Sequence, residues 1–303
     1  MVSLVVVDYN SIDKTLEYIE HVNNNISNCV SLHSLIVDNY PDSKARDHLM
    51  SIYKEYEVLD AYGYEVIRFK SEAIEFFYVK SGANLGYAKG NNLGINICNE
   101  LFNDKYSIVS NNDLIFKTKM NWSDVEHIYD SDKDICVLGP AIFGLDNDPQ
   151  SPNRRVKPFA TLIYNYLAFK PFKKIRDLDY TGESKYCFRV SGCFMILKNE
   201  LFIKAGMFDP NTFMYCEEMI LSERLNAIGA KVFFWNDFTL IHNHGSTVKK
   251  NTSAINAEKW MYESFVYYFK TYRNTSGFTR AISKACFKLF VFRRTLKYKL
   301  KKH

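Results

Sequence analysis

The chain has 303 residues, enough for one large domain with an appendage or for two small domains. Hydrophobic residues make up 47% of it, which excludes a disordered chain. Its seven cysteines are odd in number and form no CxxC pair, so we expect reduced thiols rather than a disulfide framework or a zinc knuckle.

The net charge of +5 is unevenly distributed along the chain. Residues 264–303 hold eleven Lys and Arg and no Asp or Glu, which leaves 28 basic against 34 acidic residues in the first 263. An acidic body is not expected to bind nucleic acid, whereas the basic tail predicts an anionic partner.

Membrane insertion and export are not predicted. Residues 1–7 are apolar, but Asp8 follows directly and no basic segment precedes them, which is typical of a first strand rather than a signal peptide. No apolar run approaches the roughly 18 residues that span a bilayer. We therefore expect a cytoplasmic protein, peripheral on the inner face of the plasma membrane.

The first 110 residues alternate between short apolar runs and helical patterns. Strands followed by helices in this order predict an α/β fold with a mainly parallel central sheet flanked by helices. The predicted strands are residues 4–7, 34–37, 73–79 and 106–110, and the predicted helices are residues 15–22, 45–56 and 87–101.

The rest of the chain is irregular at first and helical at its end. We divide it into a domain of residues 1–247 and a C-terminal helical extension of residues 248–303. The pattern predicts loops at 146–158 and 169–184, regular structure at 186–197, a helix at 217–228, a strand at 231–235, and helix from 256 onward.

Polar residues follow three of the predicted strands. Asn and Asp are common in turns, so each cluster taken alone is better explained as a turn. In open α/β sheets, however, ligands bind at the carboxyl ends of the strands, and three such ends favour a binding site. The clusters are Asp8-Tyr9-Asn10, Asp38-Asn39 and Asn111-Asn112-Asp113.

A glycine-bearing loop at residues 84–92 leads into a predicted helix. Gly86 and Gly90 let the backbone approach a ligand closely, Lys89 adds positive charge, and a helix N-terminus favours anions. This chemistry suits a diphosphate. The loop contains neither the Gly-Lys-Ser/Thr of a P-loop nor the dinucleotide pattern GxGxxG.

Taken together, these segments resemble glycosyltransferase family 2, in its rhamnosyltransferase-like branch, which has the GT-A fold. The resemblance covers about residues 1–247, in the family's order and spacing. The matching stretches are VVVDYNSIDKTLEYIEHV, LIVDNYPDS, NLGYAKGNN, SNNDLIF and SGCFMILKNELFIKAGMFDPNTFMYCEEMILSERLNAIGAKVFFW, followed by HNHGST.

The resemblance implies a nucleoside-diphosphate-sugar donor, either a dTDP- or a UDP-sugar. Tyr9 and Asn10 would lie against the nucleotide, Asp38 would accept a hydrogen bond from the base or ribose, and the loop 84–92 would line the nucleotide and diphosphate. The residues assigned to donor binding are Tyr9, Asn10, Asp38, Asn84, Gly86, Lys89, Asn92 and Asn112.

A divalent metal, Mg²⁺ or Mn²⁺, is also implied. Residues 111–113 stand where the family has its Asp-x-Asp metal motif, and only Asp113 is kept. One carboxylate can suffice, because such ions bind one or two carboxylates plus substrate phosphate oxygens. His242 matches the family's histidine, and His244 lies on the same side of an extended chain. We expect His242, and as a second choice His244, to bind the metal or the diphosphate.

Glu217 and Glu218 stand where the family has Glu-Asp, whose second residue is the catalytic base. Glu218 is therefore the candidate base and Glu217 the fallback. A sugar hydroxyl is a poor nucleophile until a carboxylate takes its proton. The alternative is that both glutamates simply open the following helix, where acidic side chains are favoured by the helix dipole.

The tail combines apolar residues with Lys and Arg in a helical pattern, which is typical of a helix on an anionic membrane surface. The alternative is a helix packed on the domain with a solvated basic end.

The sequence leaves three functions open. The first is an inverting glycosyltransferase that moves a sugar, with rhamnose as the leading candidate, to a hydroxyl of a surface-glycan acceptor that we expect to be lipid-linked. The second is a non-catalytic, membrane-docked glycan-binding or scaffold protein, for which the altered metal and base motifs leave room. The third, a sugar nucleotidyltransferase, would need a Gly-rich basic loop after the first strand, and residues 8–13 lack it.

Overall fold

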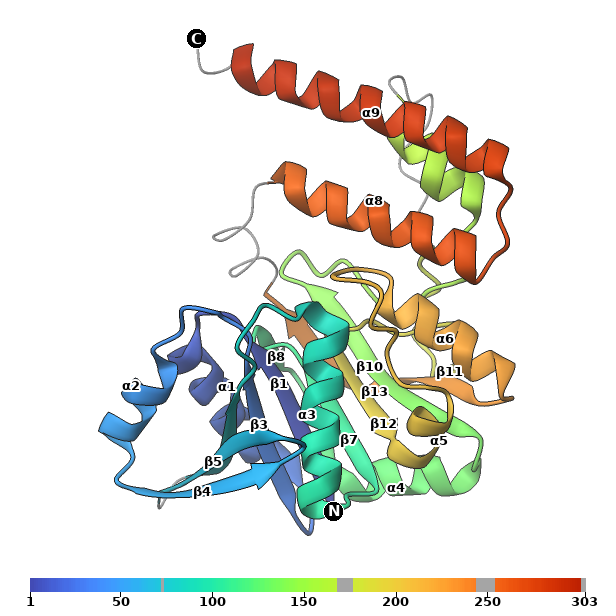
Figure 1. Ribbon diagram of the computed structural model, residues 1–303. Helices are drawn as coiled ribbons and strands as arrows, with labels where there is room; N and C mark the ends of the chain where they lie inside the picture. Colours follow the sequence, from blue (N-terminus) through green and yellow to red (C-terminus); the bar gives the residue numbers. More distant parts are fainter. Residues whose placement is uncertain (72–73, 168–176, 244–253, 301–303) are drawn as a thin grey trace.

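The computed structural model describes residues 1–303 except 72–73, 168–176, 244–253 and 301–303. An 11-stranded mixed sheet forms the body, with helices on both of its faces, and two further helices lie beyond one end of the sheet (Figure 1). The strand order is β11-β13-β10-β12-β7-β1-β3-β6-β5-β4, and β8 pairs with β13. This confirms the predicted α/β class with a central sheet flanked by helices.

The centre of the sheet is parallel, as the strand–helix order predicts. β1 pairs in parallel with β3 on one side and β7 on the other, and β3 pairs in parallel with β6. All four strands are mainly apolar and mostly buried in their interiors, as expected of strands covered on both faces. Their bounds are β1 Val2–Asp8, β3 Leu32–Asp38, β6 Glu75–Lys80 and β7 Tyr106–Ser110.

Helix α3 (Gly86–Phe102) packs very closely on this parallel centre. Small residues make the approach possible: a Cβ at Gly94 would lie 2.4 Å from a methyl of Val5, and one at Gly90 3.1 Å from a methyl of Val7. The other helices of the N-terminal half are α1 (Ile12–Asn25) and α2 (Ala45–Ile52), and a two-stranded ladder of β2 (Ile26–Ser27) and β9 (Met120–Asn121) precedes α4 (Trp122–Ser131).

One predicted element is wrong at its end. The helix expected at residues 45–56 stops at Ile52, and β4 (Glu55–Ala61) and β5 (Tyr64–Lys70) form an antiparallel hairpin at the sheet edge. Tyr62 and Gly63 connect them with φ of 53° and 74°, the positive values that a tight two-residue hairpin turn requires. The hairpin was not predicted because a tyrosine occupies the first turn position instead of the usual Asn or Asp.

The second half of the sheet is mixed. β10 (Ile135–Gly144) runs parallel to β13 (Lys231–His242) and antiparallel to β12 (Phe194–Lys198). β13 is longer than the predicted strand 231–235, since pairing resumes after a bulge and continues to its last residue. The remaining elements are β8 Leu114–Phe116, β11 Lys185–Cys187, α5 Asn199–Lys204 and α6 Glu217–Ala227.

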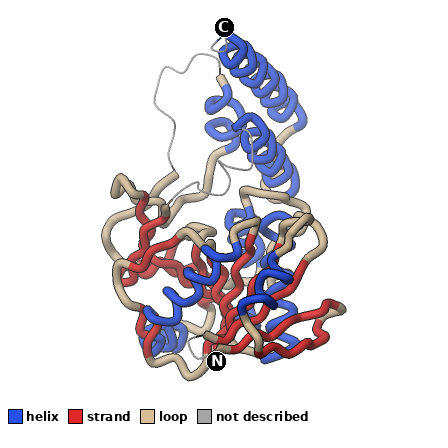
Figure 2. The backbone as a smooth tube through the Cα atoms, turned by 90° about the vertical axis from the view of Figure 1, so that its left-hand side faces the viewer, coloured by secondary structure: helices blue, strands red, loops and turns tan. Residues whose placement is uncertain are grey.

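Two long helices, α8 (Ala254–Thr271) and α9 (Gly277–Leu300), lie beyond the carboxyl ends of the parallel strands, at the opposite end from the N-terminus (Figures 1 and 2). With the short η1 (Phe159–Ile163), η2 (Tyr164–Tyr166) and part of α6, they enclose a second, smaller apolar core. In the described part of the chain, no helix is long and apolar enough to cross a bilayer.

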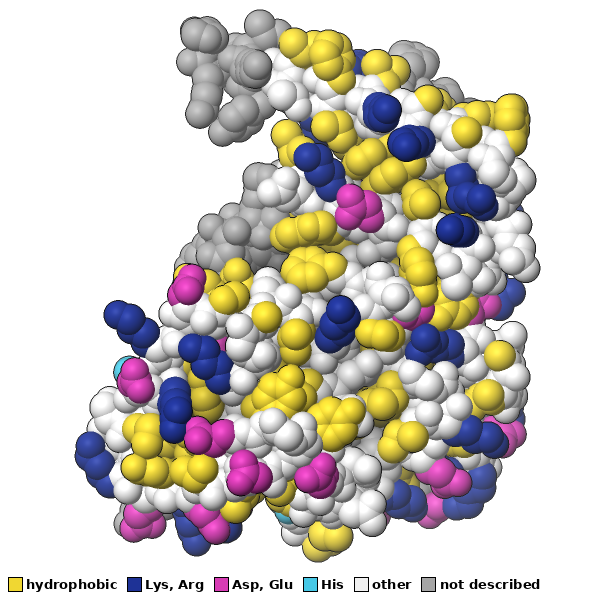
Figure 3. All heavy atoms as spheres, viewed as in Figure 1, with side chains coloured by type: hydrophobic (Ala, Val, Ile, Leu, Met, Phe, Trp, Pro, Cys, Tyr) yellow, Lys and Arg dark blue, Asp and Glu magenta, His cyan; other side chains and the backbone are white. Residues whose placement is uncertain are grey.

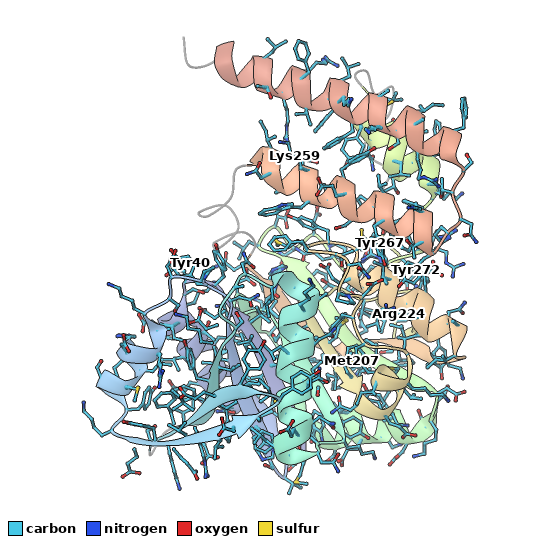
Figure 4. The ribbon with its side chains drawn as sticks, in the orientation of Figure 1. Tyr40, Met207, Arg224, Lys259, Tyr267 and Tyr272 are labelled. Carbon is cyan, nitrogen blue, oxygen red and sulfur yellow. The ribbon has the colours of Figure 1, made fainter. Side chains whose placement is uncertain are left out.

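Helix α8 is joined to the body by a partly buried polar network (Figure 4). The Asp209 carboxylate accepts hydrogen bonds from the hydroxyls of Tyr267 and Tyr272, at 2.8 and 2.5 Å. Arg224 of α6 donates to the Tyr272 hydroxyl at 3.0 Å and to the carbonyls of Gly206 and Met207. The boundary expected at residue 247 lies outside the described residues, and α8 beyond it is held to the body by these bonds.

Candidate active site

The carboxyl ends of β1, β3 and β7 meet at one edge of the sheet, which brings the polar strand ends together. Asp8 and Asp38 are register partners at the ends of β1 and β3. The backbone N–H of Asn39 donates to the backbone carbonyl of Asp8 at 2.9 Å, which extends this strand pairing by one residue. The backbone at the ends of β1 and β3 therefore lies together, as expected.

Asp8 and Asn112 are joined through two hydroxyls. Asp8 accepts from the hydroxyls of Ser11 (2.7 Å) and Thr15 (2.6 Å), and the Asn112 amide donates to the same two groups at 3.0 and 2.7 Å. Burial raises the pKa of the Asp8 carboxyl, although these hydrogen bonds oppose it. The Asn112 amide, assigned to the donor from sequence, is directed at α1 and fixes the backbone that leads into Asp113.

The predicted nucleotide region carries two tyrosine rings. Tyr9 and Tyr40, both half-buried, meet edge to face with ring centroids 5.2 Å apart. The buried Asp38 carboxylate accepts from the Tyr78 hydroxyl at 2.6 Å and from the Tyr40 amide at 3.1 Å. The exposed Asn10 has a left-handed backbone with φ of 55°. Tyr40 was not predicted; an aromatic side chain directly after Asp38-Asn39 is the signal that could have found it.

Most of the segment predicted as a loop, residues 84–92, belongs to α3, which begins at Gly86. Gly86 begins α3 with φ of 74°; its amide donates to the Asn84 side chain and its carbonyl accepts from Asn39, both at 3.1 Å. A Cβ on Gly86 would lie 2.1 Å from the carbonyl oxygen of Phe213, so only glycine fits there. Gly86 and Gly90 thus allow close packing inside the fold, Gly86 against Phe213 and Gly90 against Val7, and their approach to a ligand stays a prediction.

The two other donor-binding candidates of this segment differ. Lys89 is exposed on α3. The side chain of Asn92 is hydrogen-bonded within the fold. Its amide group donates to the backbone carbonyl of Phe208 at 2.8 Å, and its oxygen accepts from the backbone N–H of Phe208 at 3.2 Å. Asn92 therefore ties α3 to the segment that precedes α6.

Asp113 and His242 lie side by side, as the metal prediction requires. His242 ends β13, opposite Leu114 of β8, and its Nε2 is 3.2 Å from Asp113 Oδ1. The Asp113 oxygen is buried and makes no hydrogen bond of good geometry. Burial alone would lower the pKa of His242, but Asp113 and Cys193 raise it to about 10.

The second imidazole nitrogen of His242 is occupied by Gln150. Its Nδ1 lies 3.0 Å from Gln150 Oε1, an acceptor, so Nδ1 donates a hydrogen bond there, and the raised pKa keeps a second proton on Nε2, which faces Asp113. A ligating histidine commonly donates its other N–H in this way. One carboxylate and one imidazole fit a divalent ion that takes further ligands from a diphosphate. Within the described ranges no three His, Cys, Asp or Glu cluster for a metal, and His244 lies outside them.

The two candidate bases differ sharply in environment. Glu217 is buried, only 4% exposed; burial, and then the charge of Glu218, raise its pKa to about 8. Glu218 is 22% exposed, and its Oε1 pairs with the Arg189 guanidinium at 3.0 Å. Arg189 also pairs with Asp177. At neutral pH the geometry therefore favours a protonated Glu217, and Glu218 has an Arg⁺ partner.

Gly192 and Cys193, just before β12, connect the base candidate with the metal candidate. Gly192 accepts a hydrogen bond from the Tyr87 hydroxyl, and a Cβ built on it would lie 3.7 Å from Glu218 Oε2. The backbone carbonyl of Cys193 accepts a hydrogen bond from the backbone N–H of Asn111 at 2.9 Å, and Cys193 adjoins His242. Glu218 and His242 therefore lie beside consecutive residues, whose Cα atoms are about 3.8 Å apart.

A cavity of about 510 Å³ opens beside this pair. It is lined largely by residues from the stretch predicted as loops, among them Asp146, Gln150, Asn153 and Asp177, together with His242. Arg189 was not predicted either, since its only signal is a basic residue within an apolar strand-like stretch.

Comparisons with known proteins agree with the fold. No protein-family model matches the chain. The hexosyltransferase Agl10 of low-salt glycan biosynthesis, from Haloferax volcanii, is 25% identical over 198 residues, which are 61% of this chain and 59% of that protein. The crystal structure of GalNAc-T7 with UDP, GalNAc and Mn²⁺ matches with a TM-score of 0.61 at 11% identity, over 100% of this chain and 57% of the other.

The structural likeness shows that this chain has a GT-A fold of the glycosyltransferase type, as the motifs predicted. The chain spans less than three fifths of the length of either protein.

Proposed function

We propose that this protein is a glycosyltransferase that takes a sugar from a nucleoside diphosphate and transfers it with inversion. The observation that carries the proposal is that the Glu218 carboxylate lies beside Gly192, and the Asp113–His242 pair beside the next residue, Cys193. Both the fold and the hexosyltransferase relative support it.

The donor would lie across the carboxyl ends of β1 and β3. The rings of Tyr9 and Tyr40 offer a surface for a nucleobase, and the loop at residues 84–86 presents backbone beside them. The diphosphate would then reach Asp113 and His242. A bound Mg²⁺ or Mn²⁺ would act as a Lewis acid on the departing diphosphate. The neighbour crystallised with UDP and Mn²⁺ is consistent with this assignment.

Glu218 would take the proton from the acceptor hydroxyl. One of its oxygens is paired with Arg189 while the other faces Gly192, so the guanidinium holds the carboxylate in one orientation. Glu217 is the weaker candidate, because a buried carboxyl with a pKa near 8 is protonated at neutral pH and cannot accept a proton. Inversion follows if the hydroxyl attacks the anomeric carbon in a single displacement.

We further propose a dTDP- or UDP-sugar as the donor, with rhamnose as the leading sugar, and a surface glycan carried on a lipid as the acceptor. The glycan-biosynthesis relative supports a glycan acceptor, and the neighbour crystallised with UDP supports a nucleotide sugar. Rhamnose rests on the sequence resemblance alone.

Donor screening tests the proposal. A panel of nucleotide sugars with Mn²⁺ is compared by thermal shift, because a ligand stabilises the native state by mass action. The best donor is then incubated without acceptor, where a transferase slowly hydrolyses it. We expect a raised Tm for one donor class and hydrolysis that Glu218→Gln abolishes. No shift with any donor would contradict a transferase and favour a scaffold.

A further inference from the structure

Helix α9 has one face packed on the body and one face left open. On the packed side, the Ser283 hydroxyl donates to Tyr262 of α8 at 3.0 Å, and the Phe287 ring stacks on the Tyr262 ring at 3.9 Å. Phe290 meets the ring of Tyr166 from η2 at 5.3 Å. These contacts hold α9 in place, so its outer face is a fixed surface.

The outer face is apolar at regular intervals. Six residues follow one another at spacings of four and three, which places them in one stripe along a helix. Five are large and well exposed, Phe278 at 75% and Phe292 at 61% most of all. This outer stripe consists of Phe278, Ile282, Ala285, Leu289, Phe292 and Leu296.

A distant segment extends the outer stripe. Phe159 of η1 is 62% exposed, and it lines a groove of about 540 Å³ together with Phe278 and Ile282. A side chain more than 100 residues away in sequence thus adds to the same apolar surface. Its place there could not be predicted from the pattern of the tail.

Basic side chains border the outer stripe. At 100° per residue, Lys284 and Lys288 fall along one flank and Arg293 along the other. Figure 3 shows hydrophobic side chains along the upper edge of the molecule over α9, with Lys and Arg beneath them. No acidic residue occurs after Glu263, so α9 itself carries charge of one sign.

We propose that the outer stripe and Phe159 dock this protein on the surface of an anionic lipid bilayer. Exposed aromatic and aliphatic residues would enter the headgroup region while the flanking Lys and Arg meet lipid phosphates. The spacing of four and three would also suit a second copy of α9. Two such helices would set Lys and Arg against Lys and Arg, however, and that repulsion favours the anionic surface.

The docking face and the candidate active site lie at the same end of the molecule. The parallel strands end toward α8 and α9, and α8 and α9 lie beyond that edge (Figure 1). A bilayer on α9 would therefore be nearer to the site than to the N-terminal end of the sheet. The proposal concerns binding and stands whether or not the chain transfers a sugar.

Vesicle flotation of the full chain tests the proposal. Phosphatidylcholine vesicles with and without 30% phosphatidylserine are compared at low and high salt. We expect flotation with the anionic vesicles only, with a part retained at high salt. Phe278→Ser with Phe292→Ser should reduce binding at least tenfold, and adding Phe159→Ser should reduce it further. Lys284→Gln with Lys288→Gln should reduce it about 25-fold at low salt, roughly fivefold per charge.

Matched substitutions away from the face serve as controls. Val30→Ser with Val58→Ser, both exposed, should leave flotation unchanged. All these positions are at the surface, so thermal melts should show that the variants stay folded. Wild-type protein that does not float with anionic vesicles at low salt would overturn the proposal. Phe variants that float normally would also overturn it. So would Phe variants that lose only a self-association seen by light scattering, because the outer stripe would then bind a second copy of the chain.

Discussion

Glu217 should make the protein less stable as pH rises. Its carboxyl is buried, and its pKa is raised from 4.5 to about 8 by burial and then by the charge of Glu218. Between these two values the folded state binds a proton that the unfolded state has lost, so the free energy of unfolding falls with increasing pH. Glu217→Gln keeps the shape and removes this titration.

The expected gain follows from the size of the shift. One pKa unit corresponds to 1.36 kcal/mol, so the neutral variant should gain about 3 kcal/mol at pH 7 and less than about 1 kcal/mol at pH 5. At an unfolding entropy typical of a chain of this length, these are Tm increases of roughly 5 °C and 1 °C. Thermal melts of both proteins at the two pH values measure the difference.

The control is Glu200→Gln, an exposed glutamate, whose effect should not vary between these pH values. An equal Tm gain for Glu217→Gln at pH 5 and pH 7 would refute the reasoning, because Glu217 would then be ionised in the folded state. Turnover gives a second test. The Glu217→Gln variant should transfer sugar at a nearly normal rate, and a loss of transfer there would move the base from Glu218 to Glu217.

Three further changes probe the site and its support. Glu218→Gln should lower transfer by about 10²–10⁴ while nucleotide affinity, measured by calorimetry, stays within a few fold; normal turnover would dismiss it as the base. Asp113→Ala should weaken donor binding and abolish stimulation by Mn²⁺, and unchanged activity in EDTA would contradict a metal role. Tyr40→Ala should weaken nucleotide binding by roughly tenfold or more through lost stacking, whereas Tyr40→Phe should not; equal losses in both would point to its hydroxyl instead. The Tm of each variant is measured as well, and an unchanged Tm shows that a loss of binding or transfer does not come from unfolding.

The parts of the fold that were predicted well are those determined by local pattern. The strand at 106–110 matches β7, and the helix at 87–101 matches α3 within a residue at each end. In β7 the Tyr, Ile and Val favour a strand, and in α3 the spacing of apolar residues predicts a helix although the segment contains three glycines. The hairpin of β4 and β5 was missed because its only local signal, the turn at Tyr62-Gly63, has an unusual first residue.

The site was predictable only as far as residue types and the family resemblance allow. Asp113, His242 and Glu218 could be named from sequence, and the structure sets them around Gly192 and Cys193. Their partners could not be named, since Gln150 and Arg189 reach them from segments whose proximity depends on sheet order. Asn92 shows the converse: its type suits a ligand contact, but long-range packing turns it toward Phe208.

Helix α6 carries the candidate base at one end and the bonds to α8 along its length. Glu218 lies in its first turn, while Glu223 accepts from the Tyr268 hydroxyl and Arg224 donates to Tyr272. Any tilt of α8 against the sheet would therefore have to move the candidate base with it or break these partly buried hydrogen bonds. If α9 lies on a bilayer, the carboxylate of this candidate base stays at a constant height above the lipid, and under the proposed function acceptor hydroxyls at other heights would be out of reach.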